Sequence, residues 1–191
     1  MQKKRSTKEL IRISVLELLE NRTVAKITVK DIAENCGITP RTFYHYYSDK
    51  NAAINAIYIE HMTKFMDSSL TEWVEQKTKL FMSAVAFFRH ALLDEGQNNL
   101  LETIIEMDYQ KYMRHIQTEK MTPIELKIIQ NGIYYMLYGN VGLMKVSMKG
   151  NMNITPEEFS KGYHNTWDLM QEWVPQRVKS VLNEIPVSRR D

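Results

Sequence analysis

The sequence is poor in the residues that interrupt helices or crosslink chains. Its 191 residues include one cysteine, seven glycines and five prolines. A single cysteine excludes a disulfide framework and any metal site with several thiolate ligands. Turn signals are correspondingly few, and no alternating apolar run bounded by turns predicts a strand. Apolar residues recur at helical spacing instead, so the sequence predicts an all-α fold.

Long apolar runs are also missing. No segment approaches the roughly 18 apolar residues that a membrane-spanning helix needs. The basic start, MQKKRSTKEL, is not followed by the apolar stretch of a secretory signal. Apolar residues at 43% and charged residues at 25% are ordinary globular values, which excludes disordered and collagen-like classes. We therefore expect a cytoplasmic protein with no membrane partner.

The net charge is small, +2, but it is unevenly distributed. Residues 1–50 contain ten Lys or Arg against six Asp or Glu, whereas residues 51–191 contain fifteen against seventeen. A basic N-terminal part on a slightly acidic remainder favours a polyanion-binding head on a different kind of body. The charge distribution favours a boundary near residue 50, between a polyanion-binding part at 1–50 and a larger body at 51–191.

The head contains signals for three helices. The first is predicted over 7–21, with Ser6 as its N-cap and an apolar face that includes Leu18. The second starts at Thr28, where Asp31 complements the helix dipole, and it ends at Gly37.

The third helix opens at Thr39-Pro40, an N-cap followed by proline at the first helical position, and runs to about residue 46 or 47. Two short helices joined by a brief turn with a glycine are typical of a helix-turn-helix. The remaining helices are predicted at about 49–70 with Ser48 as cap, 72–94, 98–119, 123–149 and 156–183.

The third helix has the chemistry of a DNA reader, because a recognition helix directs its N-terminal residues at base edges. Arg41 can bind a guanine with two hydrogen bonds, and Thr42 can contact a base edge or a thymine methyl group. Phosphate contacts are predicted for Tyr44, His45, Lys50 and, at the start of the preceding helix, Thr28. Phe43 and Tyr47 should face inward, against Ile32 and Leu18.

These residues resemble the DNA-binding head of the TetR/AcrR family of transcriptional regulators. The resemblance covers roughly residues 8–55 and is carried by ITVKDIAENCGI at 27–38 and TFYHYYSDK at 42–50. It departs from the family at Phe43, where Leu is usual, and at Tyr47, where Phe is usual. Both departures keep apolar bulk, so the same fold is expected.

The resemblance implies a helix-turn-helix DNA-binding domain over 1–50 and an effector-binding and dimerisation domain over 51–191. It implies a homodimer of all-helical subunits that binds operator DNA, with the last two long helices of each subunit forming the interface. It also implies contacts of Thr28, Tyr44, His45 and Lys50 with the DNA backbone. The set that faces the DNA groove is Thr39, Pro40, Arg41 and Thr42. The C-terminal part, at 138–143 and 155–159, is weakly similar to the dihydroxyacetone-kinase regulator group. Some members of that group act as activators through a protein partner.

The segment 133–144 is apolar nearly all round, as in a helix buried on several sides. Gly132, Gly139 and Gly142 lie near one face of it. Because an interior helical glycine costs roughly 1 kcal/mol relative to alanine, close helix approach is a reasonable compensation. We predict a dimer interface at these glycines, joined by Trp167; the alternative is close packing within one subunit.

Eleven of the twelve methionines lie at or after Met62, and methionine suits adaptable apolar surfaces. With nearby aromatic residues they permit a pocket for a small apolar or amphipathic effector. The candidate lining residues are Trp73, Phe87, Phe88, Tyr109 and Tyr112, and ordinary core packing is the alternative for each. The histidines of the body lack partners at ligand spacing, so neither a metal site nor a cofactor is predicted.

No phosphate-binding loop, nucleophile elbow or zinc motif is present, so we do not expect an enzyme. The sequence thus predicts a sequence-specific DNA-binding regulator, acting as a repressor that a small molecule releases. The alternative is a regulator or co-activator that works chiefly through a protein partner bound by the C-terminal domain.

Overall fold

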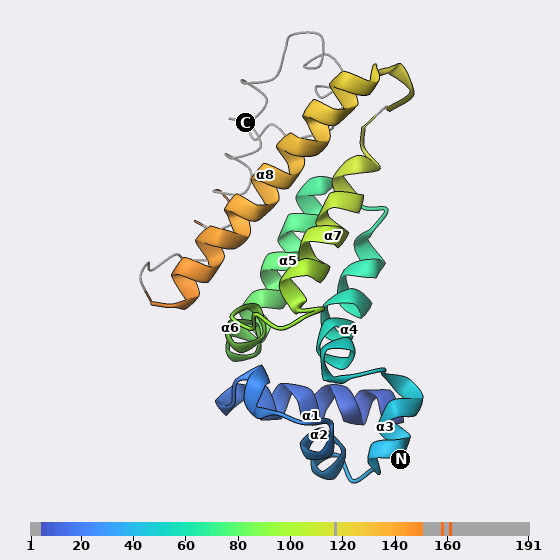
Figure 1. Ribbon diagram of the computed structural model, residues 1–191, viewed down its shortest axis with the longest axis vertical. Helices are drawn as coiled ribbons and strands as arrows, with labels where there is room; N and C mark the ends of the chain where they lie inside the picture. The colour runs from blue at the N-terminus through green and yellow to red at the C-terminus, as the bar shows by residue number, and fades with distance from the viewer. Residues whose placement is uncertain (1–4, 117, 151–157, 159–160, 162–191) are drawn as a thin grey trace. The chain divides into compact units, whose positions relative to one another are not determined.

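The computed structural model describes residues 5–116, 118–150, 158 and 161 (Figure 1). These residues form eight α-helices joined by turns and short 3-10 helices, and no strand occurs among them. The predicted all-α class is therefore confirmed. The predicted helix over 156–183 and the predicted interface residue Trp167 lie outside the described residues.

The chain divides into two compact units. The first lies within Met1–Thr63 and Ser83–Thr103, and the second within Lys64–Met82 and Ile104–Asp191. The first unit thus contains a segment that lies well beyond residue 50 in the sequence. The predicted functional boundary at residue 50 stays a prediction.

The first unit contains α1 (Thr7–Asn21), α2 (Val29–Asn35), α3 (Pro40–Tyr46), α4 (Lys50–Met62) and α6 (Val85–Leu92). α1 packs on α2, α4 and α6, and α2 packs on α3. Ser14, buried on α1, donates its hydroxyl proton to the carbonyl of Ile32 on α2 at 2.9 Å. Buried apolar side chains fill this unit, among them Ile11, Val15, Leu19, Ile32, Phe43, Ile54, Tyr58, Phe87 and Phe88.

The helix ends of the head agree with the sequence because local side chains define them. The Ser6 hydroxyl accepts the Glu9 N–H at the start of α1, and Thr28 and Asp31 form a reciprocal capping box on α2. Gly37 ends α2 with φ +69°, in the left-handed region. The Ile38 N–H reaches the Ala33 carbonyl at 2.9 Å, which completes a Schellman motif.

The second unit contains most of α5 (Leu70–Ser83) and α7 (Leu100–Met113), and all of α8 (Pro123–Met148). Thr122 and Glu125 form a capping box at the start of α8. The core is apolar, with Trp73, Val74, Ile104, Ile105, Tyr112, Ile133, Met136 and Leu137 among its buried side chains. Within the described residues no helix is long and apolar enough to cross a membrane.

Four predicted boundaries are wrong. Asp49, not Ser48, caps α4: its carboxylate accepts the Ala52 N–H at 2.8 Å. A carboxylate at this position also suits the helix dipole. α4 ends at Met62 rather than at residue 70, and α7 covers Leu100–Met113 rather than 98–119. The single helix predicted over 72–94 is two helices, α5 and α6, separated at Ala84.

Candidate nucleic-acid interface

The third helix presents a polar, exposed N-terminus. Thr39 caps α3 by accepting the Thr42 N–H at 3.1 Å, and Pro40 occupies the first turn, where its missing N–H is not needed. The hydroxyls of Thr39 and Thr42 lie 2.9 Å apart, so one donates to the other. Thr39, Pro40 and Arg41 are exposed, while Thr42 is half-buried. The groove-facing set predicted from the sequence therefore lies together at one helix end.

Aromatic packing holds the middle of α3 in place. Phe43 is fully buried, and its ring centroid lies 5.8 Å from the rings of both Tyr44 and Tyr47. Tyr44 meets it edge to face and stays 57% exposed, so its hydroxyl is free to reach outward. His45 is also exposed and meets the ring of Tyr46 edge to face at 5.3 Å. The inward role predicted for Phe43 is confirmed, and Tyr47 is half-buried.

Thr28, at the start of α2, already has local partners. Its hydroxyl accepts the Asp31 N–H at 3.1 Å and donates to the Asp31 carboxylate at 2.6 Å, and its own N–H donates to the same oxygen at 2.7 Å. These donors lower the pKa of Asp31, with the Thr28 hydroxyl as the largest cause. The Thr28 hydroxyl could donate a hydrogen bond to a phosphate only if it first gave up its hydrogen bond to the Asp31 carboxylate.

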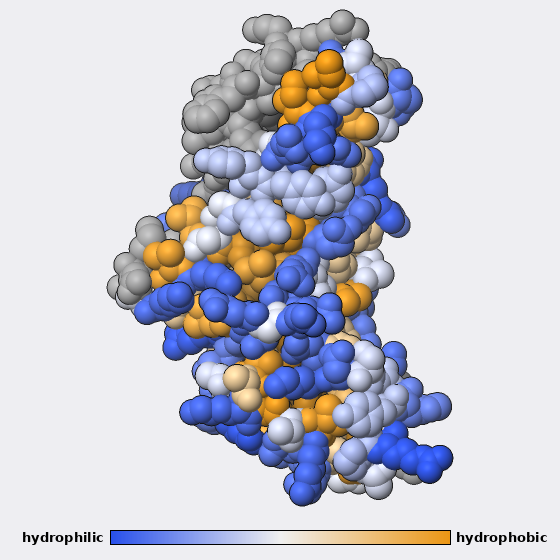
Figure 2. Space-filling model, viewed as in Figure 1, coloured by the Kyte–Doolittle hydropathy of each residue, from blue (hydrophilic) through white to orange (hydrophobic). Residues whose placement is uncertain are grey.

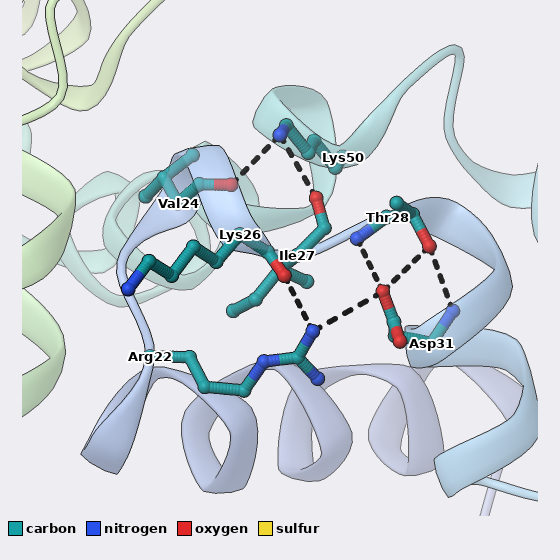
Figure 3. A network of polar contacts seen from close by, with 7 residues as sticks. All are labelled: Arg22, Val24, Lys26, Ile27, Thr28, Asp31 and Lys50. Atoms are coloured by element: carbon teal, nitrogen blue, oxygen red, sulfur yellow. Dashed lines mark hydrogen bonds and ion pairs between the residues drawn. The ribbon is translucent and has the colours of Figure 1, made fainter.

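Lys50 is turned toward the protein (Figure 3). Its Nζ atom donates to the carbonyls of Val24 and Ile27 at 2.7 and 2.9 Å. Arg22, which the sequence analysis did not single out, donates to the Lys26 carbonyl and lies 3.5 Å from the Asp31 carboxylate. No local motif marks Arg22, because its partners follow from the turn that the folded chain makes after α1.

The residues predicted to line an effector pocket fall in both units. Phe87 and Phe88 are buried in the first unit, where their rings meet edge to face at 4.9 Å. Trp73, Tyr109 and Tyr112 belong to the second unit. Trp73 and Tyr112 are buried there, and half-buried Tyr109 stacks on Tyr134 at 4.5 Å.

The predicted interface glycines lie on α8 beside exposed apolar side chains. Gly139 and Gly142 are exposed, and a Cβ atom added at either would meet no described atom within 4 Å. Gly132 is half-buried. We call the exposed side chains on the same helix the α8 stripe: Ile124, Ile128, Tyr135, Tyr138, Leu143 and Val146. Hydrophobic and weakly hydrophilic residues follow α8 on the face shown in Figure 2.

Comparison with known proteins connects this geometry to a family. Residues 16–57, which contain α2, α3 and the start of α4, match the family model of bacterial regulatory proteins of the tetR family. This N-terminal segment therefore resembles the tetR family of bacterial regulatory proteins. The match supports a DNA-binding transcriptional regulator rather than an enzyme.

Solved structures share the fold over most of the chain. The dihydroxyacetone kinase operon activator DhaS has a TM-score of 0.59 at 14% identity, covering 88% of this chain and 96% of that one. A TetR transcriptional regulator from Rhodococcus sp. RHA1 has a TM-score of 0.57 at 11% identity, covering 84% and 93%.

A third structure of this fold is NalD, the secondary repressor of the MexAB-OprM multidrug efflux pump in Pseudomonas aeruginosa. It has a TM-score of 0.55 at 13% identity, covering 89% of this chain and 97% of that one. Because one of these proteins is an activator and another a repressor, the shared fold does not decide the direction of regulation. No curated protein sequence matches the chain significantly.

Proposed function

We propose that this TetR-family regulator is a dimeric repressor that a small apolar or amphipathic effector releases from its operator. The observation that carries the DNA-reading part is the exposed N-terminal end of α3, where Thr39, Pro40 and Arg41 face solvent above the buried Phe43 anchor. Such an end can enter a major groove, and a dimer would present two of them to successive groove faces of a pseudo-palindromic site.

Binding to DNA from upstream of the protein's own gene tests the proposed function. Fluorescence anisotropy at two salt concentrations, with random DNA as competitor, separates specific binding from the phosphate contribution. We expect competitor-resistant binding with two subunits per site. The matched variant is Arg41→Ala, which removes an exposed guanidinium without touching the buried anchor. Equal binding of operator and random DNA by the wild-type protein would contradict the proposal.

The dimer interface is proposed to lie on the α8 stripe and its two exposed glycines. Exposed apolar patches of this kind mark interaction surfaces. Among the described residues, no atom lies within 4 Å of a Cβ atom added at Gly139 or Gly142, which leaves room for a closely approaching helix. The test is sedimentation of Tyr135→Asp beside Tyr135→Phe, since this side chain is 77% exposed. We expect monomers for the first and dimers for the second; dimers for both would refute this interface.

Effector release requires a difference in effector affinity between the two states of the regulator. An effector that favours the released state by about 2.7 kcal/mol would weaken operator binding roughly a hundredfold. A thermal-shift screen of apolar and amphipathic compounds, followed by anisotropy with the operator, would find such a molecule. Compounds that stabilise the protein against thermal unfolding but leave its affinity for the operator unchanged would argue against release.

A second candidate function follows from the fold shared with the activator DhaS. In this case the regulator acts chiefly through a protein partner bound by the C-terminal domain. A pull-down that recovers a stable protein partner, together with ligand-independent DNA binding, would favour this alternative. A promoter-reporter assay with and without the gene gives the direction of regulation, because deletion raises transcription for a repressor and lowers it for an activator.

A further inference from the structure

The turn between α1 and α2 is held by two cationic side chains that come from different places in the sequence. A 3-10 helix, Val24–Lys26, forms this turn, and the Ile27 N–H closes it on the Val24 carbonyl at 3.1 Å. The side chains of Val24 and Ile27 are each 2% exposed, so the turn is anchored on its apolar side. We call residues Val24–Ile27 the cation-held turn.

Three of its four carbonyls accept hydrogen bonds from cations (Figure 3). Lys50 binds the carbonyls of Val24 and Ile27, and Arg22 binds that of Lys26. Hydrogen bonds from a charged donor are roughly twice as strong as neutral ones. The turn therefore has a polar anchor as well as an apolar one, and the two cations occupy the acceptors that a water molecule would otherwise use.

The position of Lys50 in its own helix supports this role. It is the first residue of α4, where the partial positive charge of a helix end disfavours a cation. The carbonyls of Val24 and Ile27 carry partial negative charge and so stabilise the Lys50 ammonium at this helix end. Because they lie 26 and 23 residues earlier in the sequence, the contact fixes the start of α4 against the start of the helix-turn-helix.

Arg22 extends the same network to the capping box of α2. Its guanidinium lies 3.5 Å from the Asp31 carboxylate, which holds the N–H and hydroxyl of Thr28. A continuous set of polar contacts thus runs from the end of α1 to the first residues of α2. Thr28 directly follows the cation-held turn, so any displacement of the turn moves the start of α2.

We propose that Lys50 and Arg22 are positioning residues, which set DNA affinity by holding the cation-held turn and thereby the α2–α3 pair. This differs from the role that the sequence suggests for Lys50, which is a direct phosphate contact. The proposal rests on the DNA-binding function of the protein. It requires no contact between either cation and DNA.

The slope of the logarithm of DNA affinity against the logarithm of salt concentration separates the two roles. A lost phosphate contact makes this slope less steep by about 0.9 per subunit, or about 1.8 per dimer. Lys50→Met should instead weaken operator binding by at least about tenfold with an unchanged slope. A slope less steep by about 1.8 would overturn the proposal. A fraction of inactive protein scales the affinity but leaves the slope unaltered, so partial misfolding does not obscure the result.

Lys26→Met is the matched control, because it removes one positive charge from the same turn. The Lys26 side chain is exposed, its ammonium has no partner among the described residues, and only its carbonyl is held by Arg22. Loss of general electrostatic attraction affects both variants, whereas loss of the turn affects Lys50→Met alone. Equal affinities of the two variants would refute the positioning role.

Hydrogen exchange of the free protein tests the proposal without DNA. The amides of Ile27 and Thr28 are bonded inside the network, to the Val24 carbonyl and to the Asp31 carboxylate. Their exchange should be at least about tenfold faster in Lys50→Met and unchanged in Lys26→Met. Unchanged exchange in both variants contradicts the proposal even if no operator has been found, so its failure is distinct from a failure of DNA binding.

Two further variants keep the test valid if Lys50→Met does not fold. Arg22→Met removes both the contact with the Lys26 carbonyl and the ion pair with Asp31, and it should produce the same faster exchange at Thr28. Lys50→Arg keeps a charged donor and should restore both exchange protection and operator affinity to within about threefold of the wild type. If Arg22→Met exchanges like the wild type, Arg22 does not hold the turn and the proposal fails.

Discussion

A buried ion pair in the second unit gives a prediction whose size can be worked out from the structure. Lys77 on α5 and Asp108 on α7 are each 2% exposed, and their Nζ and Oδ2 atoms lie 2.6 Å apart. The other carboxylate oxygen accepts the Trp73 indole N–H at 2.7 Å. Burial lowers the pKa of Lys77, and Asp108 opposes that decrease. The charge on Lys77 therefore depends on the carboxylate.

Asp108→Asn removes the negative charge with little change of shape, and the amide oxygen can still accept the Trp73 N–H. The folded protein must then either keep an ammonium without its carboxylate or release the proton. Release at pH 7 costs at most about 4.6 kcal/mol, because an ordinary lysine pKa of about 10.4 lies about 3.4 pH units higher, at about 1.36 kcal/mol each. Loss of one partner from a buried pair typically costs about 3–5 kcal/mol. For a chain of this length we expect the melting temperature to fall by roughly 6–20 °C.

The effect of Asp108→Asn on stability should also depend on pH, in a direction that follows from the pKa of Lys77. Because the pKa of Lys77 is lower in the folded than in the unfolded state, the folded state binds fewer protons between those two values, and stability rises with pH there. Asp108→Asn removes the carboxylate that opposes this decrease, so the pKa of Lys77 falls further in the variant than in the wild type. The stability deficit of the variant should therefore shrink between pH 7 and pH 9, by up to about 2.7 kcal/mol. Thermal and urea unfolding, followed by circular dichroism at one fixed protomer concentration, measure it.

The double variant Lys77→Met/Asp108→Asn is the control. Removing both charges should recover most of the lost stability, because neutral replacements of buried pairs are often tolerated. The reasoning is refuted if Asp108→Asn unfolds within about 1 kcal/mol of the wild type at pH 7, or if its deficit grows as the pH rises.

Three further predictions concern the head and the dimer. Arg41→Ala should relax discrimination at one base position by about 1–3 kcal/mol, whereas Tyr44→Ala should weaken binding to all sequences about equally; anisotropy with single-base operator variants checks both. Thr39→Ala should lower the free energy of unfolding by about 0.5–2 kcal/mol through loss of the α3 cap, as measured by urea unfolding. Gly142→Leu should leave the helix content of the subunit intact but raise the dimer dissociation constant in sedimentation, because its Cβ meets no described atom within 4 Å in its own subunit. A dimer dissociation constant of Gly142→Leu equal to that of the wild type would mean that the interface lies elsewhere.

The head was predictable because its helix ends are encoded by residues close in sequence. Thr28 with Asp31, Gly37, and Thr39 followed by Pro40 each act within four residues, and the structure has these ends where the sequence put them. The break at Ala84 was not predictable, since no glycine or proline marks it and alanine is the best helix former.

The burial of two lysines could not be predicted from the sequence either. Lys77 and Lys111 carry no local signal that distinguishes them from the lysines of a solvated surface, where lysine usually lies. Lys111 is fully buried, and its ammonium donates to the carbonyls of Phe65, Met66 and Ser68 in a segment more than forty residues earlier. Such contacts depend on how α7 packs, and no motif of a few residues encodes that.

The charge of the head shows how composition and structure differ as guides to function. A count of basic residues suggests a broad positive surface, but the structure assigns several of these charges to partners within the protein. Arg12 binds Glu9 at 2.8 Å, and Arg22 and Lys50 hold carbonyls of the cation-held turn. Arg41 remains exposed, without an ion-pair or hydrogen-bond partner among the described residues, at the end of α3 that sequence patterns identify as the reader. The proposed roles therefore imply that affinity for DNA depends less on the number of cations in the head than on which of them the fold leaves exposed, with the internal cations fixing the positions of the exposed ones.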